Sequence, residues 1–315
     1  MDAVLVERIL AADPRAVARA LSMVEDGDPD LPELSAALFP HTGAAYTVGL
    51  TGSPGVGKSS LAGALLRAAR RREIPAAVLA VDPTSPFSGG ALLGDRLRMQ
   101  EHATDPGVFI RSMATRGHLG GIALAAPEAL RILDASGARL IVVETVGVGQ
   151  AEVDVATATD TTVVVVAPGW GDAVQVAKAG ILEIADVFSV NKADKEGANE
   201  ALRDLEMMIR MGPRMEWTPP VIRTSALDGT GVDELYEAIA AHRAHLEETG
   251  AMAERRRARQ LHEVERMAAE AFRERIASNA ADETLVEDLL ARRIDPYAAA
   301  ATLVRRASGV ESQTS

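Results

Sequence analysis

A glycine-rich segment followed by lysine and serine constrains this chain more than any other feature. Residues 52–59 read Gly-Ser-Pro-Gly-Val-Gly-Lys-Ser and fit the P-loop pattern, Gly, four residues, Gly-Lys-Ser, at every fixed position. Such a loop turns backbone N–H groups inward around phosphate oxygens. Lys58 would reach the β- and γ-phosphates, and the Ser59 hydroxyl would bind Mg²⁺. The predicted phosphate-binding residues are Gly52, Ser53, Pro54, Gly55, Val56, Gly57, Lys58, Ser59 and Ser60.

The neighbouring sequence favours this interpretation over a chance glycine-rich turn. Residues 45–50 are short, apolar and β-branched enough to form a buried strand, and leucines at 61, 65 and 66 have helical spacing. Strand, loop and helix follow in the required order, and the helix amino terminus favours a bound anion.

Composition narrows the class of protein. The 315 residues carry a net charge of −12, which disfavours nucleic acid as a partner, and 47% are hydrophobic, enough for a substantial core. The absence of cysteine excludes disulfides and thiolate metal sites. No signal peptide or bilayer-length apolar stretch is present, so we expect no membrane association and a cytoplasmic location.

Strand and helix patterns alternate over residues 44–226. The predicted strands are 45–50, 76–82, 108–111, 139–144, 161–167, 186–190 and 220–224, several of them continuous apolar runs. Such runs suit parallel strands buried on both faces. The pattern predicts an α/β fold of the P-loop NTPase type, with a mostly parallel, doubly wound sheet and ligands at the carboxyl ends of its strands.

Helical regions flank this part of the chain. We expect a helical extension over 1–43, a nucleotide-binding domain over 44–246 and a helical region over 247–315. Asp13-Pro14 predicts a helix start, and Gly27 can end that helix. A long charged helix follows residue 246, and its run 255–257 of three arginines is interpreted as a solvated face.

A second motif selects the base. Residues 191–194 read Asn-Lys-Ala-Asp directly after a predicted strand. The Asp194 carboxylate can accept hydrogen bonds from guanine N1–H and the exocyclic amine, a pair that adenine lacks. Lys192 can lie along the base, and Asn191 can fix the loop. The segment Ser225, Ala226 and Leu227 resembles the loop whose backbone N–H contacts guanine O6. Together these residues predict specificity for GTP and GDP.

Acidic residues at other strand ends suit Mg²⁺, which prefers hard oxygen ligands. Asp82 ends the second predicted strand, Asp95 lies in the loop after it, and Glu144 ends the strand before Thr-Val-Gly. The predicted metal ligands are Ser59, Asp82, Asp95 and Glu144; for Asp82 and Asp95, a helix cap or turn is the alternative. The Gly147 N–H would bind the γ-phosphate.

The catalytic residues predicted from the sequence are Lys58, Glu144, Gly147 and Lys178. Lys178, in the segment after Gly169-Trp170-Gly171, could reach phosphate or could be an exposed lysine. Ras-like GTPases place a glutamine after the glycine, whereas this chain has Val148, with Gln150 nearby. We therefore expect slow intrinsic hydrolysis.

These motifs, with Asp82-Pro83-Thr84-Ser85-Pro86, residues 116–121 (Arg-Gly-His-Leu-Gly-Gly) and residues 144–150 (Glu-Thr-Val-Gly-Val-Gly-Gln), resemble the MeaB family. MeaB proteins, also called ArgK, are P-loop GTPases associated with methylmalonyl-CoA mutase. The resemblance covers nearly the whole chain. It implies a homodimer formed through the C-terminal helices, and a chaperone that gates adenosylcobalamin delivery to an acyl-CoA mutase and protects that enzyme.

Two other classes stay open at this point. A nickel-type metallochaperone shares the fold group but would need Cys or His ligands, and the six histidines do not cluster. His242 and His245 are three residues apart, but a surface helix is the simpler interpretation. A kinase or ATPase, as the ArgK name suggests, would not need guanine selectivity.

Overall fold

The computed structural model describes residues 3–83, 105–115, 122–145, 151–169, 181–212, 215–280 and 283–308. The chain divides into two compact units, residues 1–256 and 257–315. The division into three regions expected from the sequence stays a prediction.

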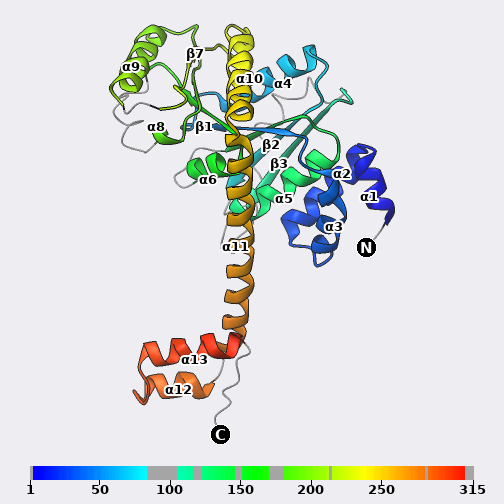
Figure 1. Ribbon diagram of the computed structural model, residues 1–315, viewed down its shortest axis with the longest axis vertical. Helices are drawn as coiled ribbons and strands as arrows, with labels where there is room; N and C mark the ends of the chain where they lie inside the picture. The colour runs from blue at the N-terminus through cyan, green and yellow to red at the C-terminus, as the bar shows by residue number, and fades with distance from the viewer. Residues whose placement is uncertain are drawn as a thin grey trace. The chain divides into compact units, whose positions relative to one another are not determined.

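A seven-stranded parallel sheet forms the centre of the first unit, in the order β3-β2-β4-β1-β5-β6-β7 (Figure 1). Its strands are β1 (Tyr46–Thr51), β2 (Ala76–Pro83), β3 (Val108–Thr115), β4 (Leu140–Thr145), β5 (Thr161–Val166), β6 (Val187–Val190) and β7 (Val221–Arg223). The predicted fold class is confirmed, and each predicted strand is present. β1 lies between β4 and β5, where the strand order changes direction, so its carboxyl end opens on the crevice in which such sheets bind ligands.

Helices cover both faces of the sheet. They are α1 (Ala3–Leu10), α2 (Pro14–Asp26), α3 (Leu31–Leu38), the short 3₁₀ helix η1 (Phe39–His41), α4 (Lys58–Arg71), α5 (Ile122–Ala135), α6 (Ala151–Ala158), α8 (Ile181–Ile184), α9 (Ala198–Met211) and α10 (Val232–Thr249). Successive strand residues point to opposite faces. Thus Ile141 and Val143 pack with α1, α2, α3 and α5, whereas Leu140 and Val142 pack with α4 and α10.

Helix α2 begins and ends where the sequence predicts. The Asp13 side chain accepts hydrogen bonds from the backbone N–H groups of Arg15 and Ala16, and Gly27 adopts the left-handed conformation at φ 63°. Arg111 on β3 donates a 2.5 Å hydrogen bond to Glu25 of α2. This half-buried ion pair attaches the N-terminal helices to the edge of the sheet.

The start of α11 (Ala251–Ala280) differs from the sequence expectation. Arg255 forms two hydrogen bonds with the Asp186 carboxylate, at 3.0 and 3.1 Å, and Arg256 pairs with the buried Asp160 at 2.8 Å. The prediction of a solvated arginine face was therefore wrong for these two residues. Asp160 and Asp186 directly precede β5 and β6, so the arginines neutralise two carboxylates at the amino ends of buried strands.

His242 was also misplaced by the sequence interpretation, because it is fully buried rather than on a helix surface. Its Nδ1 lies 2.7 Å from the Thr161 hydroxyl and its Nε2 lies 3.2 Å from Asp186. The Trp217 ring packs against both His242 and His245, at centroid distances of 5.0 and 5.1 Å. A buried polar cluster thus fills the amino-terminal edge of the sheet beneath α10.

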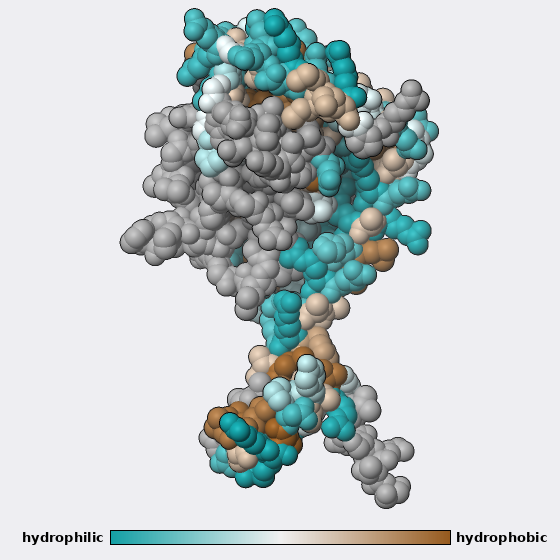
Figure 2. Space-filling view, turned by 90° about the vertical axis from the view of Figure 1, so that its left-hand side faces the viewer, coloured by the Kyte–Doolittle hydropathy of each residue, from teal (hydrophilic) through white to brown (hydrophobic). Residues whose placement is uncertain are grey.

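The second unit contains the rest of α11 with α12 (Glu283–Leu290) and α13 (Pro296–Ser308). Asp295 caps α13 by accepting hydrogen bonds from the backbone N–H groups of Tyr297 and Ala298. Leu290 is 80% exposed, and Val286 and Val304 are 44% and 45% exposed. Figure 2 shows apolar residues gathered on the surface of this unit. Over the described residues, no helix has both the length and the apolar character needed to cross a membrane.

Candidate functional site: a nucleotide pocket

The phosphate loop connects the end of β1 to Lys58, the first residue of α4. Gly52, Gly55 and Gly57 all have positive φ, at 130°, 81° and 95°. A Cβ on Gly52 would lie only 2.1 Å from the carbonyl oxygen of Val165, so β5 leaves no room for a side chain there. The glycine spacing of the motif therefore has two causes, the backbone conformation and the close approach of the neighbouring strand.

Lys58 is held inside the loop. Its side chain is 5% exposed, and its Nζ donates hydrogen bonds to the carbonyl oxygens of Gly52, at 2.6 Å, and Ser53, at 3.0 Å. The ammonium group therefore lies over the concave side of the loop. A bound phosphate would find this charge already in place, next to the amino terminus of α4.

Ser59 and Glu144 are brought together by the fold. The Ser59 hydroxyl hydrogen-bonds to the carboxylate of Glu144, which ends β4 and is 6% exposed. Both groups offer hard oxygen atoms on the side of the loop where a triphosphate would lie. This pair fits Mg²⁺, because that ion is bound by a few protein oxygens together with substrate phosphates.

Asn191 connects the base-recognition motif to the phosphate loop. Its Nδ2 donates to the carbonyl oxygen of Val56 at 2.9 Å, and its Oδ1 accepts from the Ala226 N–H at 3.2 Å and from the Thr224 hydroxyl at 3.3 Å. A Cβ on Gly57 would lie 2.5 Å from that Nδ2 atom. One buried amide thus joins three loops that are far apart in sequence.

Lys192 and Asp194 lie beside this amide. Lys192 has a positive φ of 58°, and its Nζ donates to the carbonyl oxygen of Gly55 at 2.5 Å. Its alkyl stem therefore crosses toward the tip of the phosphate loop. Asp194 is exposed, and one of its oxygens accepts a 3.3 Å hydrogen bond from Ser225. The carboxylate is thus accessible to a base, while Ser225 fixes its orientation.

The structure describes some of the remaining candidate residues and not others. Leu227 is 89% exposed at the edge of the base site, whereas Ala226 is buried. The backbone of Asp82 ends β2, near the same edge of the sheet, but its side chain is outside the described residues. Asp95, Gly147, Val148, Gln150 and Lys178 also lie outside them. The roles assigned to all site residues stay predictions.

Sequence reasoning missed two contributors to the site. Thr224 is fully buried and hydrogen-bonds to Asn191 and to the Ser189 hydroxyl, the latter at 2.7 Å. Val165 contributes only its carbonyl oxygen, which closes the space beside Gly52. No local pattern could have indicated either residue, since both act through contacts with distant segments.

The described part of the chain contains no group of three or more His, Cys, Asp or Glu side chains arranged to hold a metal ion. Of the groups that the sequence proposes for Mg²⁺, the structure therefore describes a pair, Ser59 and Glu144, which would need phosphate or water oxygens to complete a coordination shell.

Comparison with known proteins supports a GTPase. The family model described as methylmalonyl Co-A mutase-associated GTPase MeaB matches residues 17–281. A protein of Pyrococcus horikoshii that is named as a GTPase is 47% identical over 310 residues, covering 97% of this chain and 98% of the relative. A fused isobutyryl-CoA mutase of Cupriavidus metallidurans is 36% identical over 245 residues, which are 74% of this chain and 22% of that protein. The solved structure of a LAO/AO transport system kinase superposes with a TM-score of 0.72 at 26% identity, covering 96% of this chain and 95% of that one.

Proposed function

The chain belongs to the MeaB family and is a GTPase, and we propose that it is a chaperone for an acyl-CoA mutase that uses adenosylcobalamin. In this proposal the GTP-bound and GDP-bound forms gate delivery of the cofactor and protect the mutase. The reaction itself is the hydrolysis of GTP to GDP and phosphate.

The observation that carries the nucleotide part is the contact of Asn191 with Val56. Through it, the loop that would recognise guanine and the loop that would bind phosphate form one rigid support. Asp194 would accept hydrogen bonds from guanine N1–H and the exocyclic amine, and Lys192 would lie along the base. Discrimination against adenine follows because adenine leaves that carboxylate without donors.

The residues of this chain would act on the phosphates as follows. Water attacks the γ-phosphorus, the bond to the β–γ bridging oxygen breaks, and the released GDP carries the electron pair. Lys58 and the backbone N–H groups of the phosphate loop balance the growing negative charge. Ser59 and Glu144 would hold Mg²⁺, which when bound would neutralise part of the negative charge of the phosphates. The remaining proposed groups, Gly147 and Lys178, would contact the γ-phosphate, and Asp82 and Asp95 would support the metal.

The mutase partner is supported by the relative from Cupriavidus metallidurans. In that protein a segment similar to this chain is part of a polypeptide named as a fused isobutyryl-CoA mutase. Val148 supports a partner-dependent GTPase, because valine cannot orient the attacking water as glutamine does. Methylmalonyl-CoA mutase and isobutyryl-CoA mutase are the first partners to test.

The test is GTP hydrolysis by the purified chain, alone and with each mutase. We expect a slow basal rate, at least tenfold stimulation by the cognate mutase, and no comparable hydrolysis of ATP. The Lys58→Ala variant should abolish both rates, which identifies this site as their source. Absence of stimulation by every mutase tried would refute the partner assignment, and equal use of ATP would favour the kinase or ATPase class.

We also propose a homodimer formed through residues 247–315. Leu261, Val264 and Met267 on α11 are 54%, 62% and 54% exposed in the single chain, a larger apolar surface than a solvated helix needs. Light scattering should give twice the chain mass for the natural protein and a lower mass for Val264→Glu. A monomeric natural protein at micromolar concentration would contradict this part of the proposal.

A further inference from the structure

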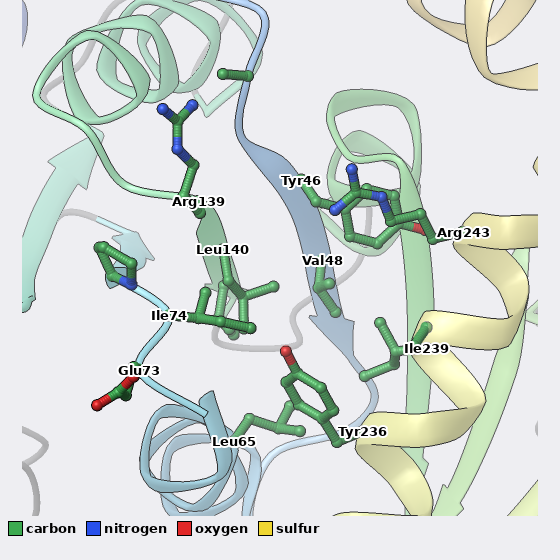
Figure 3. Close-up of a pocket in the computed structure, with 14 residues that line it drawn as sticks. Tyr46, Val48, Leu65, Glu73, Ile74, Arg139, Leu140, Tyr236, Ile239 and Arg243 are labelled. Atoms are coloured by element: carbon green, nitrogen blue, oxygen red, sulfur yellow. The ribbon is translucent and has the colours of Figure 1, made fainter. Parts of the chain in front are cut away.

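A second pocket lies on the other side of the molecule from the phosphate loop. It has a volume of about 370 Å³ and opens between α4 and α10, near the amino-terminal ends of β1 and β4 (Figure 3). The phosphate loop follows the carboxyl end of β1, so the two sites use opposite ends of the same strand. A ligand in this pocket would not overlap the nucleotide.

The interior of the pocket is apolar. Its walls come from buried aliphatic side chains of both strands and both helices, namely Val48, Leu65, Leu140, Val142 and Ile239, with Ile74 at the side. The volume of the pocket lies at the lower end of the range of roughly 300–1,000 Å³ that small-molecule sites have. That size suits a compact aliphatic chain.

The mouth of the pocket is polar and carries arginine. Arg139, Arg243 and Glu73 are exposed at its edge. The Arg243 guanidinium lies 5.1 Å from the centroid of the Tyr46 ring, and it also pairs with Glu247 at 2.8 Å. Among the described residues, the Arg139 side chain has no hydrogen bond or ion pair, although its backbone is fixed by bonds to Pro75 and Tyr46. Arg243 thus shares its charge with Glu247, and Arg139 is the guanidinium at the mouth that is open to an anionic ligand.

One polar group points inward. Figure 3 shows the Tyr236 hydroxyl directed toward the centre of the pocket, with Arg139 and Arg243 at the opposite end. Burial raises the pKa of this hydroxyl, so at neutral pH it is a neutral donor. The Arg72 guanidinium packs on the outer part of the same ring, 4.3 Å from its centroid, and pairs with Asp233 and Glu237, which fixes the ring.

From this arrangement we propose that the pocket binds an organic carboxylate with a compact aliphatic chain. The chain occupies the apolar interior, and the carboxylate accepts hydrogen bonds from Arg139 and Arg243 at the mouth. Small-molecule sites combine these features, an apolar cavity and a few convergent polar groups. Arginine is suited to the role because its planar fork matches a carboxylate. This site is independent of the proposed partner and of the nucleotide.

Octanoate is the probe, since it has the expected size and charge. Calorimetric titration of the full chain should show one site, at the same affinity with and without saturating GDP. Octanamide, of equal length but uncharged, should bind at least tenfold more weakly. The double variant Arg139→Gln, Arg243→Gln should lower the affinity for octanoate by about tenfold or more, because it removes charge-assisted hydrogen bonds.

Two further variants make the result specific. Ala240→Trp places a large ring at the exposed mouth and should block octanoate while leaving GDP affinity unchanged. Arg203→Gln removes an exposed arginine of α9, away from the pocket lining, and should change nothing. The proposal is overturned if octanoate does not bind at millimolar concentration, if octanamide binds equally well, or if GDP displaces octanoate. GDP binding by all these variants shows that they are folded and keeps this test separate from that of the GTPase.

Discussion

The side-chain amide of Asn191 donates a hydrogen bond to the carbonyl oxygen of Val56, 2.9 Å away, across a sequence separation of 135 residues. The base motif and the phosphate loop are therefore joined directly by a buried hydrogen bond.

Replacement of Asn191 by alanine should separate the two loops. The change leaves the buried Val56 carbonyl and the Ala226 N–H without this partner, which costs about 1–3 kcal/mol for each group. We expect lower stability and at least tenfold weaker GDP binding, measured by denaturant unfolding and calorimetry. Asn199→Ala is the matched control, because it removes an exposed asparagine whose one side-chain partner in the described part of the chain is Arg223, at 2.8 Å. If both variants bind GDP equally well, the connection has no energetic importance.

Two glycines of the phosphate loop should respond differently to alanine. At Gly55 a Cβ meets nothing within 4 Å, so only the left-handed conformation is penalised, by about 1–2 kcal/mol. At Gly52 the Cβ would lie 2.1 Å from a backbone carbonyl of β5, so the loop must move. We expect Gly52→Ala to abolish GDP binding and Gly55→Ala to retain it, as measured by calorimetry. The reverse order would mean that the loop is not held against β5.

The Asp194→Asn variant tests base recognition. Asparagine keeps one acceptor for N1–H but replaces the acceptor for the exocyclic amine by a donor. That donor matches the C2 carbonyl of xanthine. GTP should therefore bind about tenfold or more weakly, and XTP about tenfold or more tightly, than to the natural protein. Competition against a fluorescent GDP analogue measures both affinities. Unchanged preference for GTP would show that this carboxylate does not contact the base.

The Glu144→Gln variant tests the Mg²⁺ site. Loss of the carboxylate charge should reduce Mg²⁺-dependent hydrolysis by about 100-fold, the order that loss of one charge-stabilising group costs. Nucleotide binding in EDTA should stay within about twofold of the natural protein, since the phosphate loop is untouched. Ser59→Ala should show the same pattern if the two oxygens serve one ion. A loss of nucleotide binding in EDTA as large as the loss of hydrolysis would instead indicate damage to the phosphate loop.

Asp186 should make stability depend on pH. Burial raises the pKa of its carboxyl, but the neighbouring His242 and Arg255 side chains outweigh this effect and hold the pKa below its ordinary value. Because the folded-state pKa is depressed, the stabilisation is complete well above the unfolded pKa of about 4 and is lost as the pH falls through the folded value. Asp186→Asn should thus cost about 3 kcal/mol at pH 7, measured by urea unfolding, and this difference should shrink below about pH 4.

The exposed ion pair of Glu247 with Arg243 is the control for this buried one. The Glu247→Gln variant should lower the free energy of unfolding by at most about 1 kcal/mol. A pH-independent effect of Asp186→Asn would show that its charge is not what stabilises the amino ends of β5 and β6.

Local sequence patterns were enough to predict the strands, a helix cap and the phosphate loop. The seven strands follow from short apolar runs, and the cap at Asp13 and the phosphate loop follow from residues within a few positions of each other. These features depend on backbone conformation and on side-chain periodicity, which a segment of ten residues largely determines. The parallel order of the sheet follows from the alternation of strands and helices.

Tertiary structure alone decided which polar residues meet. Arg255 and Arg256 looked like a solvated run, and His242 like a surface histidine, but carboxylates at the starts of β5 and β6 draw them inward. The contact of Gly52 with Val165, and the pocket between α4 and α10, depend on segments up to about two hundred residues apart, whose approach depends on the packing of the whole sheet. The sequence by itself therefore determined the nucleotide chemistry and the class of fold. Only the three-dimensional packing decided which charges are buried and where a second ligand would fit, because burial depends on neighbours that no local pattern records.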